Sequence, residues 1–203
     1  MARHSQRRDT KKVMVVLGDG KTEQHYLNHL KKLKNYKFTS RPSLFSNVTI
    51  EKVDCYIDEY LSGGCNNIIY ITDYDTIINQ NKLEKFKKLK RKYSQKKEVL
   101  ICETMPSIEF WFLLHFCKTT TEFINCEEVT RYLKRYLPDY DKNDSYLKLS
   151  KWVEILCSNG GLDKAINNSE VVFKEKNQGN KGDHFPFSSI HIAIALFEET
   201  RER

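Results

Sequence analysis

The sequence predicts an α/β fold in which a mostly parallel, four-stranded sheet with flanking helices is followed by a helical C-terminal part. Two observations support this prediction. Apolar runs of strand length alternate with segments of helical spacing up to residue 116, which is typical of a parallel sheet joined by crossover helices. Beyond Pro106 the strand pattern stops and helical spacing continues. The sheet is therefore expected in the first half of the chain.

The first expected unit is a strand, a loop and a helix. Residues 12–17 form an apolar run rich in Val, and this run ends in the loop Gly18-Asp19-Gly20. The helix begins near Thr22 and carries apolar side chains at helical spacing, with basic residues on its other face. A second strand is expected over residues 48–53, and a small helix over residues 56–61.

The third expected strand, residues 67–72, is a continuous apolar run of the kind found in a central strand buried on both faces. It places Asp73 at its carboxyl end. A long basic helix over residues 80–97 and a fourth strand over residues 98–102 complete the sheet unit. The later helices are expected over residues 107–116, 126–136, 148–157 and 188–199.

These elements divide the chain into three parts. Residues 1–11 are polar and basic and read as a disordered lead, residues 12–116 form the sheet-bearing core, and residues 117–203 form a helical extension packed on the core. We find no internal repeat and no low-complexity linker in the 203 residues. One domain with one site is the expectation.

Composition favours a polyanionic partner. The net charge is +7, from 34 Lys and Arg against 27 Asp and Glu, and basic side chains that neutralise phosphates release bound counterions. A Lys-rich helix such as residues 82–97 is nevertheless more often a solvated face. The six cysteines form no CxxC pair, which favours free thiols, and the chain shows neither a membrane span nor a signal peptide. A cytoplasmic protein is expected.

Acidic side chains follow three of the predicted strands. The carboxyl ends of strands in an open parallel sheet face one crevice, so these side chains are expected to meet there. Carboxylate oxygens suit Mg²⁺ or Mn²⁺, and a cluster of four or five could hold two ions for phosphoryl chemistry. The expected metal ligands are Asp19, Glu23, Asp73, Asp75, Ser107 and Glu109.

Each of these residues also has a simpler interpretation. Asp73 and Asp75 form a DxD pair, which is common in turns and caps. Glu23 could only stabilise the positive end of its helix, and Ser107 could only cap the next one, leaving Glu109 without a further role. Their common position at strand ends favours one shared site.

Three segments resemble signatures of the RloB-like family: GDGKTEQHY at residues 18–26, TDYD at residues 72–75 and MPSIEFWFLLHF at residues 105–116. The segment PFSSIH at residues 186–191 resembles a fourth more loosely. The resemblance implies a Toprim-type catalytic core, a role in bacterial anti-phage defence by abortive infection, and an AAA or ABC-type ATPase partner. The acidic pattern is also similar to that of the overcoming-lysogenization-defect nucleases.

One position departs from the family pattern. Asp19 stands where the family usually has Glu, so its carboxylate is drawn back by about 1.5 Å. That change could weaken the metal site or leave more of the work to Glu23. The nucleases also use a late lysine on the phosphate, for which Lys176 and Lys181 are the candidates; a solvated loop lysine is the alternative.

Aromatic and histidine residues near these motifs favour structural roles. Trp111 and His115 lie on an apolar helix and are expected in the core. For His191 the sequence favours neither a structural nor a catalytic role.

The expected function is a metal-dependent endonuclease that cleaves phosphodiester bonds in RNA, tRNA included, or in DNA. Metal-bound water would be the nucleophile, and Asp19 or Glu23 the general base. The alternative is a catalytically weak or inactive Toprim-like subunit that binds nucleic acid and regulates a partner ATPase. A topoisomerase-like or primase-like activity is a third, weaker hypothesis. A homo-oligomer is compatible with the sequence, which does not determine the oligomeric state.

Overall fold

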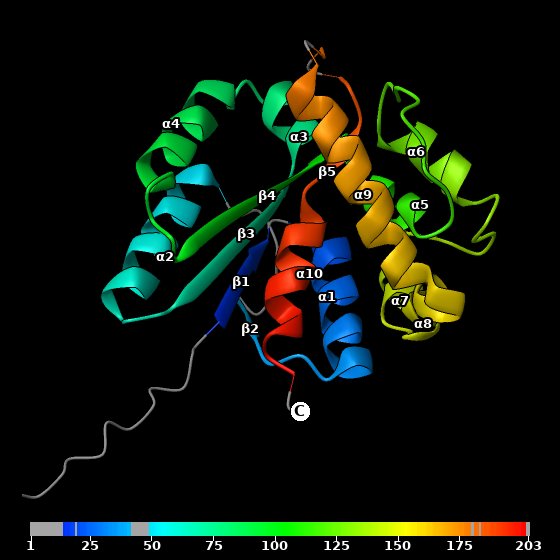
Figure 1. Cartoon of the computed structure of the whole chain (residues 1–203), viewed down its shortest axis with the longest axis horizontal. Helices are drawn as coiled ribbons and strands as arrows, with labels where there is room; N and C mark the ends of the chain where they lie inside the picture. The colour runs from blue at the N-terminus through cyan, green and yellow to red at the C-terminus, as the bar shows by residue number, and fades with distance from the viewer. Residues whose placement is uncertain (1–13, 19, 42–48, 180, 183, 202–203) are drawn as a thin grey trace, which may run out of the picture.

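The computed structural model describes residues 14–18, 20–41, 49–179, 181–182 and 184–201 (Figure 1). The lead expected to be disordered, residues 1–11, lies outside these residues. So do the first two residues of the first expected strand and the candidate ligand Asp19.

The sheet is mostly parallel, as the sequence predicts, and has five strands in the order β2-β1-β3-β4-β5. The three central strands β1 (Met14–Gly18), β3 (Asn67–Asp73) and β4 (Val99–Met105) run parallel and match expected strands. The short edge strand β2 (Thr39–Arg41) pairs in parallel with β1, and β5 (Phe187–Ser188) pairs antiparallel with β4. Neither edge strand was expected, because each has only two or three residues.

Both faces of the sheet are covered, because side chains of a strand alternate between its two faces. Met14 and Val16 enter the larger core cluster, whereas Val15 and Leu17 enter the second one. The continuous apolar run of β1 therefore reflects burial on both sides.

The second cluster lies under α2 (Ile50–Ser62) and α4 (Leu83–Tyr93), which cover one face of the sheet; the short helix α3 (Tyr74–Asn79) follows β3 directly (Figure 1). Helix α4 buries Phe86, Leu89 and Tyr93 at helical spacing. The helix of the structure, residues 83–93, is shorter than the helix expected over residues 80–97.

The prediction of a strand over residues 48–53 was wrong, since residues 50–53 open helix α2. Ile50, Val53 and Ile57 are buried at spacings of three and four, which is a helical period. Thr49 caps the helix by accepting a hydrogen bond from the backbone N–H of Lys52. A short apolar run of this kind fits a strand or a helix. The N-cap at Thr49 and the spacing of the buried residues favour the helix.

The other face carries α1 (Lys21–Lys34), α5 (Ile108–Leu114), α9 (Gly161–Gln178) and α10 (Ile190–Glu198) (Figure 1). Outside them lie α6 (Cys126–Leu133), α7 (Asp144–Leu147), α8 (Lys151–Cys157) and a 3-10 turn, η1 (Ser158–Gly160). Helix α9 was not expected. Its buried face includes Ala165 and Ser169, so the sequence lacks a strong apolar stripe there. The C-terminal helices share one core with α1 and α5.

Trp111 and His115 lie in the core, as predicted, and both are almost fully buried. The indole N–H of Trp111 donates to the Tyr26 hydroxyl at 2.7 Å. His115 Nδ1 lies 2.9 Å from the backbone carbonyl of Leu156, which accepts its hydrogen. None of the helices in the described part of the chain combines the length and the apolar character that a membrane crossing requires.

Burial lowers the pKa of His115 to about 4, so we predict a loss of stability in weak acid. The folded pKa lies below the unfolded value of about 6.5, so the unfolded chain takes up the proton first. The stability that depends on neutral His115 is fully present above pH 6.5. As the pH falls from 6.5 toward 4, the free energy of unfolding decreases by about 3 kcal/mol. Urea unfolding at several pH values measures this. His115→Gln should flatten the dependence in this range, and an unchanged slope would contradict the assignment.

Candidate active site

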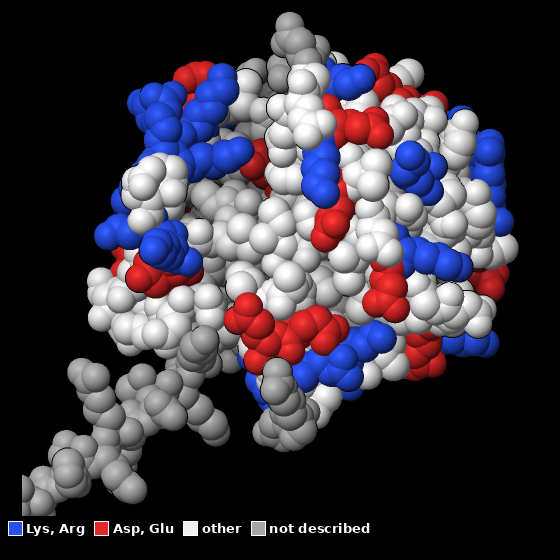
Figure 2. Space-filling view, in the orientation of Figure 1, with Lys and Arg blue, Asp and Glu red and all other residues white. Residues whose placement is uncertain are grey.

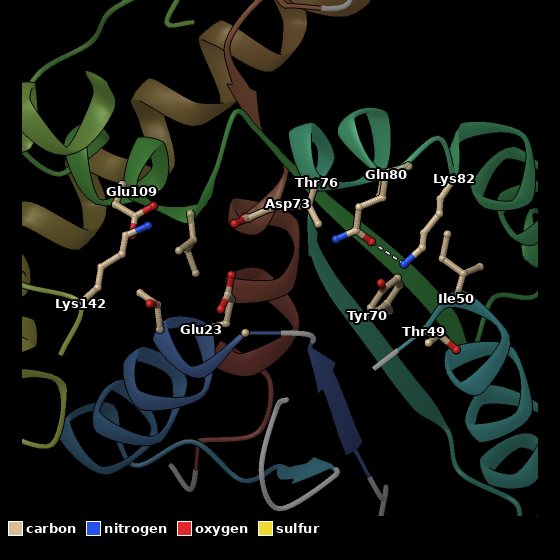
Figure 3. A pocket seen from close by; sticks show the side chains of 14 residues that line it. Glu23, Thr49, Ile50, Tyr70, Asp73, Thr76, Gln80, Lys82, Glu109 and Lys142 are labelled. Carbon is tan, nitrogen blue, oxygen red and sulfur yellow. Dashed lines mark hydrogen bonds and ion pairs between the residues drawn. The ribbon is translucent and has the colours of Figure 1, made fainter. Parts of the chain in front are cut away.

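A cavity of about 370 Å³ lies at the carboxyl ends of the central strands. Its lining comes from the loop after β1, the first turn of α1, the end of β3 and the start of α5, and also from the loop that carries Lys142 (Figure 3). The structure brings three of the expected ligands to this one cavity: Glu23, Asp73 and Glu109 all line it.

Glu23 reaches the cavity because Gly20 leaves room for it. The side chain of Glu23 is only 3% exposed, and its carboxylate folds back over Gly20. A Cβ atom on Gly20 would lie 2.0 Å from Glu23 Oε2. Gly20 has extended backbone angles that any residue adopts, so the close approach of the carboxylate is what requires glycine.

Asp73 and Asp75 separate at the junction of strand and helix. Asp73 is the last residue of β3 and the N-cap position of α3, and it lines the cavity (Figure 3). Asp75 lies in the first turn of α3 and does not line it. Burial raises the pKa of Asp75, and the charge of Lys142 partly offsets this effect. Because α3 begins at Tyr74, directly after the strand, Asp75 lies within the helix and only Asp73 lines the cavity.

Glu109 is fully buried and has three partners. Ser107 donates to its Oε2 at 2.7 Å, and the Tyr140 hydroxyl donates to its Oε1 at 2.8 Å. The Lys142 ammonium lies 2.8 Å from the same Oε1. Burial and the charge of Glu109 hold the pKa of Tyr140 well above its usual range, so the phenol stays a donor. This network fixes Glu109 and Lys142 relative to each other.

Lys142 is a charged residue of the cavity that was not among the residues expected from the sequence. Its side chain is 44% exposed and points into the cavity from the loop between α6 and α7 (Figure 3). Burial lowers its pKa, but attraction to Glu109 outweighs that effect and leaves the pKa raised. No motif surrounds Lys142. Only the folded position of its loop reveals it.

The two lysines proposed from the sequence lie elsewhere. Lys176 is at the end of α9 and donates to the carbonyl of Gly182 at 2.7 Å, and Lys181 lies over the ring of Phe185. Neither lines the cavity, whose cationic residues in the described part of the chain are Lys82 and Lys142. His191 lies 2.8 Å from the Ser169 hydroxyl, in a separate groove between α9 and α10.

The donor chemistry of the cavity suits a hard cation. Glu23 and Asp73 supply carboxylate oxygens from neighbouring elements, and the residue between β1 and Gly20 is Asp19, outside the described residues. Among the residues that the structure describes, no three His, Cys, Asp or Glu side chains lie close enough together to hold one ion. Mg²⁺ commonly takes one or two carboxylates with water and phosphate, so a pair of ligands fits it.

The model of the RloB-like protein family matches residues 13–196. The chain belongs to the RloB-like protein family. The match confirms the resemblance inferred from the three signature segments. It covers every residue of the cavity in this RloB-like chain, from Gly20 to Lys142. No curated protein and no solved structure matches the chain.

Proposed function

We propose that this RloB-like chain is a Toprim-type, metal-dependent endonuclease that cleaves phosphodiester bonds in RNA or DNA. The observation that carries the proposal is one cavity at the strand ends that holds Glu23, Asp73, Glu109 and a cation, Lys142. Carboxylates beside a lysine are the groups that hold a divalent ion and a phosphate together. Pockets for small-molecule ligands are mostly apolar, whereas this one is lined largely by charged and polar groups.

Glu23 and Asp73 would hold Mg²⁺ or Mn²⁺, and Asp19, four positions before Glu23 in the sequence, is the further expected ligand. The ion would supply positive charge to the scissile phosphate. Two ions would require further ligands from the expected set, of which Asp75 and Ser107 do not line the cavity.

Lys142 would contact a non-bridging oxygen of the phosphate and stabilise the charge that develops there. Its ammonium is positioned by Glu109, and Glu109 is positioned by Tyr140 and Ser107. The attacking water would give its proton to a carboxylate of the same cluster, for which Glu23 and Asp19 are the candidates. Lys142 thereby takes the role that the sequence analysis gave to Lys176 or Lys181.

The biological setting is proposed from the family. A cytoplasmic enzyme of bacterial anti-phage defence, acting with an AAA or ABC-type ATPase, agrees with the RloB-like match and contradicts nothing in the fold. Co-purification of the chain with the product of a neighbouring ATPase gene tests the partner.

Cleavage assays test the activity. The purified chain, alone and with its ATPase, is incubated with labelled tRNA, single-stranded RNA and plasmid DNA in Mg²⁺, in Mn²⁺ and in EDTA. We expect cleavage of at least one nucleic acid with either ion and none in EDTA. The absence of cleavage under all these conditions, or equal cleavage in EDTA, would refute the proposal.

One observation favours the alternative of an inactive nucleic-acid-binding subunit. Both oxygens of Glu109 are already engaged by protein groups, so Glu109 is a poor ligand in this arrangement. Calorimetric titration with Mg²⁺ separates the two functions. Heat of binding that disappears in the double variant Glu23→Gln/Asp73→Asn supports the nuclease, and the lack of any Mg²⁺ binding supports the inactive subunit.

Gly20→Ala is expected to disable the site without unfolding the protein. The new Cβ would meet the end of a flexible side chain, so Glu23 would move away from the cavity while the backbone stays in place. A misplacement of about 1 Å can lower activity about 100-fold. We expect weaker Mg²⁺ binding and cleavage about 100-fold slower, with little change in melting temperature. Gly63→Ala, where a Cβ has ordinary contacts, is the matched control. Equal activity of the two variants would contradict the role of Glu23.

A further inference from the structure

The catalytic cavity extends past its acidic centre toward α4. Its far end is formed by Ile50, Gln80 and Lys82, on the opposite side of Asp73 from Glu109 and Lys142 (Figure 3). Ile50 also lines a second groove, between α2 and α4, with Lys85, Lys88 and Leu89. Because Ile50 lines both hollows, they are neighbours, and we call the line from the acidic centre through both hollows along α4 the path.

The α4 side of this path is strongly basic. Lys85, Lys88 and Lys92 line the groove at spacings of three and four, which places them on one face of α4, and Lys82 stands at the N-terminal end of that face. Figure 2 shows Lys and Arg side chains gathered over α4. A cationic row that begins inside a carboxylate-lined cavity is suited to a partner with repeated negative charge.

Ion pairs divide these lysines into two groups. Lys85 lies 2.7 Å from Glu51, and Lys92 lies 2.8 Å from Asp54, so α2 neutralises both. Lys82 donates to the neutral amide of Gln80. Lys88 forms no ion pair with any of the residues that the structure describes. Lys82 and Lys88 are thus the cations of this path whose charge stays available to a ligand.

We infer that the path is a binding track for a single strand of the nucleic acid substrate, with Lys82 and Lys88 contacting successive backbone phosphates on one side of the cleaved bond. The inference rests on the proposed function and adds where the strand runs. Six residues of helix rise about 9 Å, so the two ammonium groups can serve neighbouring phosphates of an extended strand. A positively charged groove that follows the backbone is the usual device for binding single strands without sequence preference.

The test is binding of labelled single-stranded RNA and of the same sequence as DNA, in EDTA so that no strand is cleaved. Lys82→Gln/Lys88→Gln is compared with Lys87→Gln/Lys97→Gln, which removes the same charge from α4 and the loop after it but lines neither hollow. For the first pair we expect about tenfold weaker binding at about 50 mM salt. Because each phosphate contact contributes about 0.7 to the salt dependence, the slope of log K against log salt should fall by about 1.4. The control pair should change the slope by less than half of this, and Lys82→Arg/Lys88→Arg should retain binding.

Shortening the strand from either end locates the track. In the wild-type protein, removing nucleotides from one end should weaken binding more than removing them from the other, and the Lys82→Gln/Lys88→Gln variant should lose this asymmetry. Equal losses in both double variants, or an unchanged slope, would overturn the track. The track and the nuclease proposal can fail separately. If only Lys82→Gln/Lys88→Gln weakens binding but no metal-dependent cleavage is found, the track stands and the nuclease proposal is refuted. If cleavage is found but the two double variants bind equally, the nuclease proposal stands and the track is refuted.

Discussion

Asp73→Asn is expected to lower metal-dependent cleavage about 1,000-fold, which corresponds to about 4 kcal/mol of transition-state stabilisation. Asp73 ends the central strand β3 and lines the cavity beside Glu23. The substitution keeps the shape of the side chain and removes the charge that would hold the ion. Asp73 makes no capping hydrogen bond to α3, so the helix should start as before.

The measurement is the initial rate of cleavage in saturating Mg²⁺, with Mg²⁺ affinity from calorimetry. Asp163→Asn is the matched control, because Asp163 lies exposed on α9, away from the cavity. Both variants should melt within a degree or two of the wild type, since neither changes the core. Cleavage by Asp73→Asn at the rate of the control would show that the ion does not sit at β3.

Gly161→Ala should be the most destabilising small substitution in the C-terminal half. A Cβ at this position would lie 1.9 Å from the backbone carbonyl oxygen of Leu156, and a backbone atom cannot move aside cheaply. The same carbonyl accepts the hydrogen bond from His115, so its displacement also disturbs a buried partner. Overpacking of this kind costs about 1 to 3 kcal/mol, and the lost hydrogen bond adds about 1 kcal/mol.

For a chain of this size we expect the melting temperature to fall by about 5 to 10 °C. Differential scanning calorimetry measures it. Gly182→Ala is the control, because a Cβ there meets no atom within 4 Å. Equal melting temperatures for the two variants would mean that η1 and the start of α9 relax freely, against the close packing seen around His115.

The sequence alone determined the central sheet and its acidic edge. Residues 68–71 are all apolar because β3 is buried on both faces, and a signal this local is visible in the sequence without the fold. Parallel strands end at one edge, so Glu23, Asp73 and Glu109 could be grouped from their positions after predicted strands or in the following helix turn. The RloB-like family could also be identified from the sequence, because its signature segments are short, continuous stretches at those strand ends.

Only the tertiary structure decided which charged groups share the cavity. Lys142 lies 33 positions after Glu109 and reaches it through a loop whose path depends on the packing of Tyr140 against the core. Asp75 turned away from the cavity because α3 starts directly after β3. Lys85 and Lys92 are neutralised, and Lys82 and Lys88 are not, because of where α2 places Glu51 and Asp54. Such contacts join residues distant in sequence, and pairings of this kind are set by packing rather than by local pattern.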